Sequence, residues 1–303
     1  MISIVCVYNN QDILKNILLK SLKTQTTKFE LITIDNTNHK YESAAQALNF
    51  GGENSNNKYI MFVHQDVELH SNSWLQDAET YLDSIQNLGI AGVAGISEKG
   101  NTDNERARNI IRHGPDYHVW GNSINSPEPV QTLDECLTII PQTVFQKLKF
   151  DEGVCIDWHL YAVDYCLTVK RMNLAVYVLP MYIYHKSLGF SSSEYYQTVI
   201  NILEKHKDHI QSIYASGGSW STAIDITKQL CDRLEEKNNL INAITAELQR
   251  REEMYTYSGL FWKFRNTYNK FIHKAFPYSS RKRKIYSFLH ESLKSNPLKV
   301  NKE

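Results

Sequence analysis

The feature that most limits how this chain can fold is a run of five apolar residues, 59–63, that ends abruptly at His64, Gln65 and Asp66. A strand at the edge of a sheet would expose many of these side chains to water. The run is therefore typical of a central strand in a parallel sheet that is covered on both faces. Ligands of open α/β sheets bind beyond the carboxyl ends of such strands. The sequence thus places Asp66 where a ligand or a metal would be bound.

Asp66 has a simpler interpretation, as an ordinary strand-end residue or as the cap of the helix predicted at residues 72–85. Ser71 and Asn72 are better suited to cap that helix, because they lie immediately before its first apolar residues. Asp66 is then left without a capping role. A carboxylate in this position is suited to a divalent metal.

Apolar patterns in the first 96 residues alternate between strand and helix. They predict strands at residues 2–8, 29–35, 59–63 and 89–96, and helices at residues 13–22, 43–50 and 72–85. This alternation favours βαβ units, and hence a Rossmann-like α/β fold with a mainly parallel sheet and helices on both faces. Three of the strands end in polar residues, at Tyr8, Asp35 and His64. These ends are expected to share one rim of the sheet.

A polar segment at residues 98–128 follows, which contains several Gly and Pro residues and is too long for an ordinary connector. We interpret it as a mobile lid or an acceptor-binding insertion, and a surface loop without a function is the alternative. Further strands are predicted at residues 135–140 and 175–180. A helix between them is predicted to begin near residues 157–159, and helical spacing would put Asp157, Tyr161 and Asp164 on one face.

Charge is divided unevenly along the chain. The 303 residues include 33 Lys and Arg and 33 Asp and Glu, so the formal net charge is zero. Residues 1–223 hold 17 basic and 24 acidic side chains, whereas residues 224–303 hold 16 basic and nine acidic ones. An acidic front and a basic tail predict two functions. Because the excess of basic residues lies away from the predicted rim, nucleic-acid binding is not expected.

The five cysteines are scattered and include no C-x-x-C pair, which favours reduced, buried thiols over a zinc or redox site. The first residues show no basic segment followed by a long apolar one, and no stretch of about 18 apolar residues occurs. These features predict a cytoplasmic protein without a membrane span.

The C-terminal part is predicted to begin with a coiled-coil-like helix at residues 223–258. If Thr227 takes position a of a heptad, six of nine core positions are apolar, namely Leu230, Leu234, Ile241, Ile244, Leu248 and Tyr255. This seam predicts a homo-oligomer, although Lys237 and Arg251 fall at d positions. A helix packed on its own domain is the alternative.

Residues 259–303 have the pattern of a basic amphipathic helical tail. Between residues 260 and 299 the sequence holds ten Lys and Arg and a single acid, Glu291. This balance suits an anionic membrane surface. It would make the protein peripheral at the inner face of the cell membrane, where it would meet a lipid-linked acceptor.

Several motifs together resemble the inverting glycosyltransferases of family 2, which have the nucleotide-sugar-binding GT-A fold. The resemblance covers about residues 2–209. It rests on Tyr8-Asn9-Asn10, Ile34-Asp35-Asn36, residues 47–51, His64-Gln65-Asp66, Phe150-Asp151-Glu152, residues 159–164 and Tyr184-His185-Lys186-Ser187. It implies metal-dependent, inverting transfer from a nucleoside-diphosphate donor, a UDP-sugar, to a saccharide or lipid-linked glycan. Bacterial surface polysaccharide or glycan synthesis is the implied setting.

The resemblance assigns the donor side of the site position by position. Asp35 would contact the uracil or the ribose. Asp66 would be the last residue of the D-x-D motif that holds Mn²⁺ or Mg²⁺ on the diphosphate, and His185 would complete that metal site. His64 replaces the first Asp of the motif, so fewer carboxylates would hold the metal. The remaining donor-binding residues would be Tyr8, Asn10, Asn49, His64 and Gln65.

The acceptor side departs from the family pattern. The usual base is the Asp of an E-D pair at the start of the late helix, where Tyr161-Ala162 stands here. Asp164 matches a further acid of the pattern and Asp157 precedes it. Both are candidates for the catalytic base, with Glu135 and Asp134 next. The predicted acceptor-binding residues are Asp134, Glu135, Trp158, His159 and Tyr161.

Other classes of enzyme lack their motifs in this sequence. A G-x-G-x-x-G pattern, as in nicotinamide dehydrogenases, does not follow the first strand. A Gly-rich loop ending in Gly-Lys-Ser/Thr, as in nucleoside triphosphatases, is also missing. A non-catalytic GT-A-like binding or scaffold protein that acts through its helical tail remains the alternative, because Ala162 replaces the expected base.

Overall fold

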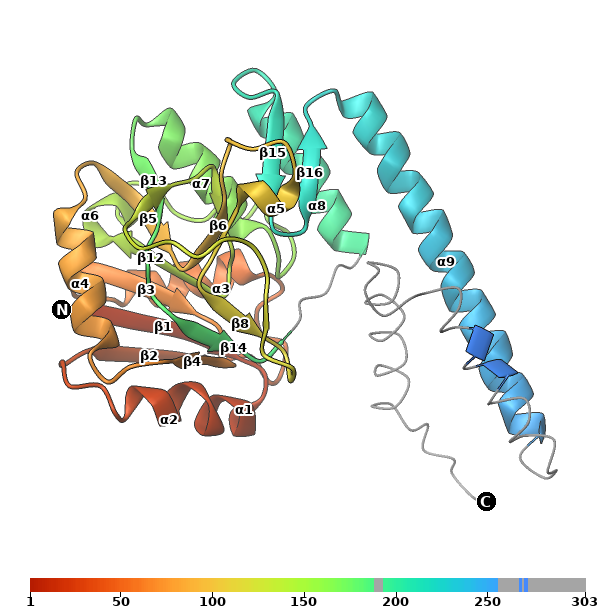
Figure 1. Ribbon diagram of the computed structural model, residues 1–303, viewed down its shortest axis with the longest axis horizontal. Coiled ribbons are helices and arrows are strands. Elements are labelled where there is room, and N and C mark those ends of the chain that lie inside the picture. The colour runs from red at the N-terminus through yellow and green to blue at the C-terminus, as the bar shows by residue number, and fades with distance from the viewer. Residues whose placement is uncertain (188–192, 256–266, 269, 272–303) are drawn as a thin grey trace. The chain divides into compact units, whose positions relative to one another are not determined.

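The structure, a computed structural model, describes residues 1–187, 193–255, 267, 268, 270 and 271 (Figure 1). The chain divides into two compact units, Met1–Arg233 and Leu234–Glu303. The first unit holds all the predicted site residues. The division lies about ten residues beyond the expected boundary at 222/223.

Seven strands form the central sheet, in the order β10-β13-β5-β12-β3-β1-β2. Their bounds are Ile2–Tyr8 (β1), Glu30–Asp35 (β2), Tyr59–Val63 (β3), Leu88–Gly92 (β5), Glu128–Pro129 (β10), Leu137–Pro141 (β12) and Ala175–Val178 (β13). β12 lies antiparallel between β3 and β5, whereas β1 is parallel to β2 and β3, and β13 is parallel to β5. Five strands therefore share one direction, and the predicted α/β fold with a mainly parallel sheet is confirmed.

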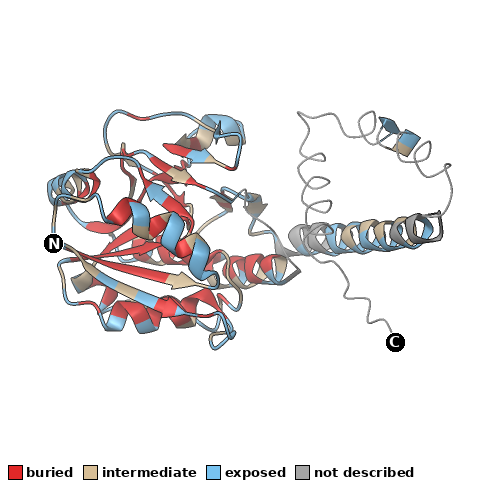
Figure 2. Ribbon diagram, turned by 90° about the horizontal axis from the view of Figure 1, so that it is seen from below, coloured by how far each residue is buried: buried red, intermediate tan, exposed pale blue. Residues whose placement is uncertain are grey.

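Both faces of the sheet are buried, which explains the apolar run in β3. Met61 packs into a core cluster with Leu18 of α2 and Trp74 of α4, whereas the next residue, Phe62, packs into a second cluster with Leu48 of α3. The helices on the Met61 face are α1 (Gln11–Asn16), α2 (Leu18–Leu22) and α4 (Trp74–Ser84). Those on the Phe62 face are α3 (Ala44–Glu53), α6 (Gln142–Phe145) and α7 (Tyr161–Arg171). β3 and β5 are buried along their whole length and β1 and β12 along most of it, and Figure 2 shows much of the inner part of the sheet in the colour of buried residues, whereas the edge strand β2 is largely intermediate or exposed.

Helix α3 lies unusually close to its neighbours, because it contains two consecutive glycines. A Cβ atom on Gly51 would come within 2.3 Å of Val5 Cγ1, and one on Gly52 within 2.3 Å of the Phe145 ring. Such distances leave no room for any side chain. The pair thus lets α3 pack closely against β1 and α6.

Short strands build three smaller sheets beside the main one. β4 (Val67–Leu69), β14 (Ile183–His185), β8 (Ile111–His113) and β9 (His118–Val119) form the largest of them. β11 (Thr132–Leu133), β6 (Ala94–Ile96) and β7 (Ala107–Asn109) form the second, and β15 (Ser212–Ala215) pairs with β16 (Gly218–Ser221). The predicted strand at 89–96 is therefore two strands, β5 and β6, which belong to different sheets.

The segment at 98–128 is not the continuous loop that the sequence suggested. It contains α5 (Asp103–Arg106) and the strands β7, β8 and β9, and it ends at β10. β8 pairs in parallel with β14, which ends at His185. The segment therefore helps to build the rim of the site, and its action as a lid stays a prediction.

The helix predicted to begin near residue 157 begins later, at Tyr161. Leu160 precedes it in the left-handed region, with φ of 67°, so the chain turns sharply there and residues before it are not helical. Asp157 therefore does not share a helical face with Tyr161 and Asp164, and that part of the prediction is wrong.

The C-terminal elements are α8 (Ser193–His206) and α9 (Ile224–Tyr255). Along α9 the large apolar side chains of Leu234, Leu240 and Ile244 are exposed, and Glu247 forms an ion pair with Arg251. The predicted basic tail at 259–303 lies outside the described residues except for 267, 268, 270 and 271. No helix among the described residues is long and apolar enough to span a membrane.

Candidate active site

The ends of β1 and β3 are tied together by Gln65. Its Oε1 atom accepts hydrogen bonds from the backbone N–H groups of Asn9 and Asn10, at 3.1 and 3.0 Å, and its Nε2 atom donates to Asn9 Oδ1 at 2.6 Å. Asn10 in turn caps α1, since its side-chain oxygen accepts from the N–H groups of Asp12 and Ile13. Two predicted donor-binding residues, Asn10 and Gln65, thus meet at the rim.

A second pair of predicted donor residues lies where β1 and β2 end. Tyr8 and Asp35 are opposite each other in the parallel ladder, and Asp35 is exposed. Hydrogen bonds from the side chain and backbone of Thr37 hold the pKa of Asp35 below its ordinary value. An ionised, accessible carboxylate can accept hydrogen bonds from sugar hydroxyls or from a base N–H.

Three potential metal ligands converge at the end of β3. His64 Nδ1 lies 3.4 Å from His185 Nε2, and the same His185 atom lies 3.4 Å from Asp66 Oδ1. Ligand atoms of the three side chains all lie within 4.8 Å of one another. Within the described residues this is the one such group of His, Cys, Asp or Glu side chains.

The chemistry of this group fits a divalent metal. Two imidazole nitrogens and one carboxylate oxygen are ligands that suit Mn²⁺ and related transition metals. A structural zinc site would instead be rich in thiolates. Asp66 is fixed in orientation because the backbone N–H and the hydroxyl of Ser187 both donate to its Oδ2 atom. Such support of a ligand by its neighbours is usual in metal sites.

The electrostatics keep His64 and Asp66 in their ligand forms. Burial would lower the pKa of His185, but the hydrogen bond and charge of Asp66 raise it on balance, so a metal would displace the proton of that imidazole. Desolvation, followed by the nearby His185, lowers the pKa of His64 to about 4, so its imidazole is neutral at neutral pH. Burial alone would raise the pKa of Asp66, but the hydrogen bond and charge of His185 outweigh it and the pKa falls below its usual range. A neutral imidazole and an ionised carboxylate are what a metal requires.

A second layer of polar residues surrounds His64. The Tyr161 hydroxyl donates to the backbone oxygen of Glu135 at 3.1 Å and lies 3.3 Å from His64 Nε2. Glu135 Oε2 lies 3.8 Å from Nδ1 of His159. The predicted acceptor residues Glu135, His159 and Tyr161 are thus brought together next to the metal group.

Asp134 lies beside the same group. The backbone N–H of Cys136 donates to its Oδ1 atom at 3.0 Å. Burial alone would raise the pKa of Asp134, but the charge of His185 and this hydrogen bond lower it on balance. Trp158, the remaining acceptor prediction, is half-buried and packs on the core cluster of α3 and α7.

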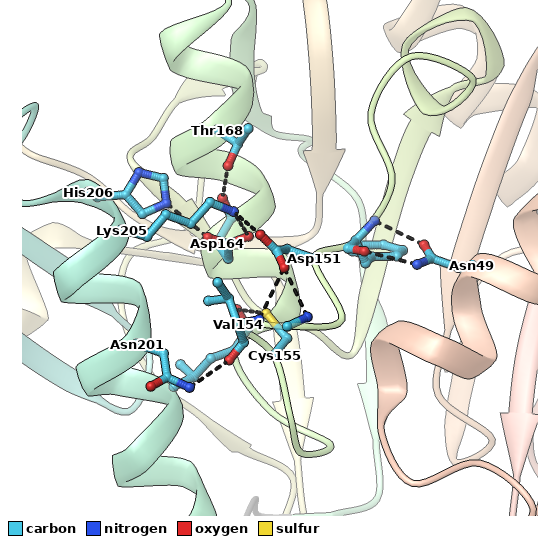
Figure 3. A network of polar contacts seen from close by, with 12 residues as sticks. Asn49, Asp151, Val154, Cys155, Asp164, Thr168, Asn201, Lys205 and His206 are labelled. Carbon is cyan, nitrogen blue, oxygen red and sulfur yellow. Dashed lines mark hydrogen bonds and ion pairs between the residues drawn. The ribbon is translucent and has the colours of Figure 1, made fainter.

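Asp164 has a different environment from the one expected of a catalytic base. It is 2% exposed, and its carboxylate contacts Lys205 Nζ at 2.7 Å and His206 Nε2 at 2.9 Å (Figure 3). Lys205 Nζ also lies 2.9 Å from Asp151 Oδ2. The network joins α7 to α8, so Asp164 stabilises the packing of two helices and its oxygens are already engaged. This environment disfavours Asp164 as the base, and that assignment stays a prediction.

Asn49 is likewise occupied by structural contacts. Its Nδ2 atom donates to the backbone oxygen of Phe150 at 2.9 Å and to Glu152 Oε1 at 2.8 Å, and its Oδ1 atom accepts from the N–H of Phe150. These bonds join α3 to the segment before α7 (Figure 3). These contacts occupy the amide group of Asn49, and its donor contact stays a prediction.

Sequence reasoning missed three contributors to this region. Ser187 orients Asp66, the His113 ring centre lies 5.8 Å from that of His185, and Lys205 neutralises Asp164. The Tyr184-His185-Lys186-Ser187 motif was a signal for Ser187. His113 and Lys205 reach their places through long-range packing, for which the local sequence carries no signal.

Comparison with known proteins identifies the family. A model described as "Glycosyltransferase like family" matches residues 2–206, more than half of the chain. The chain belongs to this glycosyltransferase-like family. The resemblance to glycosyltransferases, first indicated by the motifs, is confirmed at this level. No curated protein matches the chain.

Solved structures with a similar course of the chain include several glycosyltransferases. S. aureus TarS, residues 1–349, shares 15% identity over 67% of this chain and 64% of its own, with a TM-score of 0.46. GalNAc-T7 with UDP, GalNAc and Mn²⁺ shares 14% identity over 69% of this chain and 50% of its own (TM-score 0.49). The mannosyltransferase PcManGT of Pyrobaculum calidifontis, in complex with GDP-Man and Mn²⁺, shares 11% identity over 89% of this chain and 80% of its own (TM-score 0.49). The chain thus spans slightly less than two thirds of the TarS fragment, and these similarities carry no information about its own substrates.

Proposed function

We propose that this protein transfers a sugar from a nucleoside-diphosphate donor to an acceptor hydroxyl group, with a divalent metal held by His64, Asp66 and His185. The observation that carries the proposal is the convergence of these three side chains at the carboxyl end of β3, in a chain of a glycosyltransferase-like family. Mn²⁺ or Mg²⁺ is the metal that we propose. When bound, such an ion offsets negative charge on the departing diphosphate.

The donor that we propose is a UDP-sugar, bound along the ends of β1 and β2. Asp35 would accept hydrogen bonds from the uracil or ribose, and Tyr8 beside it would form one wall. The segments after β1 and β3 are joined by hydrogen bonds of Gln65 with Asn9 and Asn10, between Tyr8 and Asp66. These bonds fix the shape of both turns before the donor binds. A preorganised turn lowers the cost of ordering on binding.

The acceptor that we propose is a saccharide or lipid-linked glycan, and the transfer is inverting. An acceptor oxygen would attack the anomeric carbon in line with the departing diphosphate, so a single displacement reverses the configuration. We expect His159, Tyr161 and Trp158 to lie along the path by which the acceptor approaches. Bacterial surface polysaccharide or glycan synthesis is the setting that this chemistry suits.

A non-catalytic role is the second candidate, because one observation favours it. Ala162 stands at the position of the family's base and is fully buried, so no group at that position can accept a proton. A protein of this kind would bind the nucleotide sugar and act as a scaffold through its helical tail. Donor turnover distinguishes the two candidates.

The test is nucleotide release from UDP-glucose, UDP-galactose, UDP-N-acetylglucosamine and GDP-mannose, each with Mn²⁺ and with a chelator. We expect release from at least one donor with Mn²⁺ and a loss of at least about a hundredfold with the chelator. Binding of these donors without any release would support the scaffold role. Neither binding nor release of any donor would contradict the proposed function.

The tail leads to a proposal about location, namely that the protein acts in the cytoplasm as a peripheral protein of the inner face of the cell membrane. Its support is the charge balance between residues 260 and 299, which hold ten Lys and Arg and a single acid. Sedimentation with liposomes of phosphatidylglycerol and of phosphatidylcholine tests it. We expect binding to the anionic liposomes alone, and the binding should fall as salt rises.

A further inference from the structure

The proposed transfer needs a group that accepts a proton. The residue at the position of the family's base has no such group in this chain. Ala162 offers only a buried methyl group, and Asp164 is paired with Lys205 and His206. A replacement must lie next to the metal group and must remain accessible to an acceptor. The pair formed by Glu135 and His159 meets both conditions.

The pair adjoins the metal group through Tyr161. The Tyr161 hydroxyl bridges the backbone oxygen of Glu135, at 3.1 Å, and His64 Nε2, at 3.3 Å. Glu135 precedes β12, which is antiparallel to β3, so the polar end of β3 and the start of β12 lie side by side. His159 precedes α7 in the turn that Leu160 makes.

The two members of the pair differ in exposure. The His159 side chain is 27% exposed and that of Glu135 is 16% exposed. Oε1 of Glu135 is buried and has no hydrogen-bond partner, whereas Oε2 faces His159 Nδ1 at 3.8 Å. Nε2 of His159 has no partner among the described residues. The imidazole is therefore the member of the pair that an acceptor hydroxyl can reach.

We propose that His159 accepts the proton of the acceptor hydroxyl group through Nε2, and that Glu135 is a positioning residue whose carboxylate faces Nδ1 of the same ring at 3.8 Å and favours the tautomer with its proton there. The arrangement takes the place of the carboxylate that the family has at position 162. A base whose other nitrogen is held by a carboxylate keeps the correct tautomer and orientation. This assignment rests on the proposed function and adds the identity of its base.

The step balances in atoms and charge. A bond forms between the acceptor oxygen and the anomeric carbon as the bond between that carbon and the diphosphate oxygen breaks. The hydroxyl proton passes to His159 Nε2, the electron pair of the broken bond leaves with the nucleoside diphosphate, and the imidazolium then releases its proton to water. No oxidant, reductant or other co-reactant is required.

The charges around His159 suit this role. Burial would lower the pKa of its imidazole, but Glu135, Asp157 and Asp134 together raise it above the ordinary value. Other titratable groups nearby include His64 at the end of β3 and Tyr161, whose hydroxyl lies between Glu135 and His64. Tyr195 on α8 also lies close, with its ring centre 5.8 Å from that of His159. Glu135 contributes the largest favourable interaction, so its removal weakens the base.

Oε1 of Glu135 is one of several buried side-chain atoms without a hydrogen-bond partner among the described residues, and it belongs to the carboxylate beside His159. Buried polar atoms are nearly always hydrogen-bonded, and an exception calls for an explanation. Burial also raises the pKa of Glu135, so its charged form is disfavoured in this position. A carboxylate retained at such a cost to stability is typical of catalytic machinery.

The test compares full-length His159→Asn and Glu135→Gln with the wild type and with His209→Asn, a matched change at an exposed histidine beyond α8. Nucleotide release from the donors named above, with Mn²⁺ and with water as acceptor, gives kcat and kcat/KM as a function of pH. Calorimetric titration with UDP and Mn²⁺ shows whether each variant is folded and binds.

We expect His159→Asn to lose about a hundredfold or more in kcat while the Kd for UDP with Mn²⁺ changes less than about twofold. Glu135→Gln should lower kcat/KM and move the acidic limb of its pH profile to lower pH, by on the order of one unit, because the imidazole loses its anionic neighbour. His209→Asn should match the wild type.

Two results would overturn the assignment while the proposed function stands. One is wild-type turnover in His159→Asn, and the other is a Glu135→Gln profile that drops equally at every pH without a shift of its limb. A wild-type protein that binds UDP with Mn²⁺ but releases no nucleotide from any donor overturns both the transfer and its base. These measurements therefore distinguish a wrong base from a wrong reaction.

Discussion

The Nδ1 atom of His64 lies 3.4 Å from Nε2 of His185, although 121 residues separate the two histidines. β14 brings them together, because it pairs antiparallel with β4 and sets His185 opposite Val67, the residue after Asp66. The N–H of Lys186 then donates to the backbone oxygen of Asp66 at 3.1 Å. The candidate metal group is therefore assembled by the pairing of two three-residue strands, β4 and β14.

Ser187 is expected to tune metal affinity without binding the metal. Its hydroxyl and its N–H both hold Asp66 Oδ2, so Ser187→Ala leaves the carboxylate less well oriented. Loss of such a contact typically costs about 10–100-fold in metal affinity. We expect a weaker Kd for Mn²⁺ by that factor in calorimetric titration, and no change for the exposed control Ser84→Ala. Equal affinity in both variants would exclude a role for Ser187.

Asp164 is expected to be essential for stability rather than for chemistry. Asp164→Asn removes a buried charge from between Lys205 and His206, and breaking a buried ion pair costs about 3–5 kcal/mol. Thermal unfolding should show a Tm lower by on the order of 10 °C, with the exposed Asp208→Asn as control. Well below its Tm, the variant should bind UDP with Mn²⁺ as the wild type does. An unchanged Tm with lost turnover would instead return Asp164 to the catalytic site.

The sheet was largely predictable from the sequence, because β3 alternates between two buried faces and so is apolar throughout. Ligand positions at the strand ends followed from the same reasoning and from the motif at Tyr184-His185. The environment of Asp164 did not follow, since its partners Lys205 and His206 lie about 40 residues further along on another helix. Helical spacing also failed at Asp157, because the left-handed Leu160 lies between it and α7.

The short strands at 98–128 could not be predicted either. β7, β8 and β9 have only two or three residues each, too few for an alternating pattern to be recognised. They exist because β6 and β14 supply hydrogen-bonding partners from elsewhere in the chain. Local propensity carries no information about such partners.

Glu135 is expected to lower the stability of the folded protein at neutral pH. Burial raises its pKa, so folding disfavours the charged form, and the penalty is present above the folded pKa and absent below the unfolded value of about 4.5. Glu135→Gln should therefore raise the Tm by about 2–4 °C at neutral pH. The gain should shrink as the pH falls and disappear near pH 4. A gain of the same size at both pH values would mean that packing, not charge, is responsible, and the exposed Glu42→Gln serves as control.

The seam of α9 is expected to mediate self-association of the full-length chain. Ile241 and Ile244 occupy a and d positions, and Ile244 is 51% exposed. A double change of both to Lys places charges in a coiled-coil core, whereas Ala246→Lys places one at an exposed position f. Light scattering should find the double variant monomeric and the control oligomeric like the wild type. A wild-type monomer, or an oligomeric double variant, would rule out this seam.

The central claim, that His64, Asp66 and His185 hold a metal that binds the donor's diphosphate, is tested most directly by the linkage between UDP and Mn²⁺. Calorimetric titration of UDP into the wild type and into Asp66→Asn, each with Mn²⁺ and with a chelator, gives four affinities. We predict at least about tenfold tighter UDP binding with Mn²⁺ in the wild type, and loss of most of that gain in Asp66→Asn. The same UDP affinity with and without Mn²⁺ in the wild type, or a full metal effect in Asp66→Asn, would contradict the account.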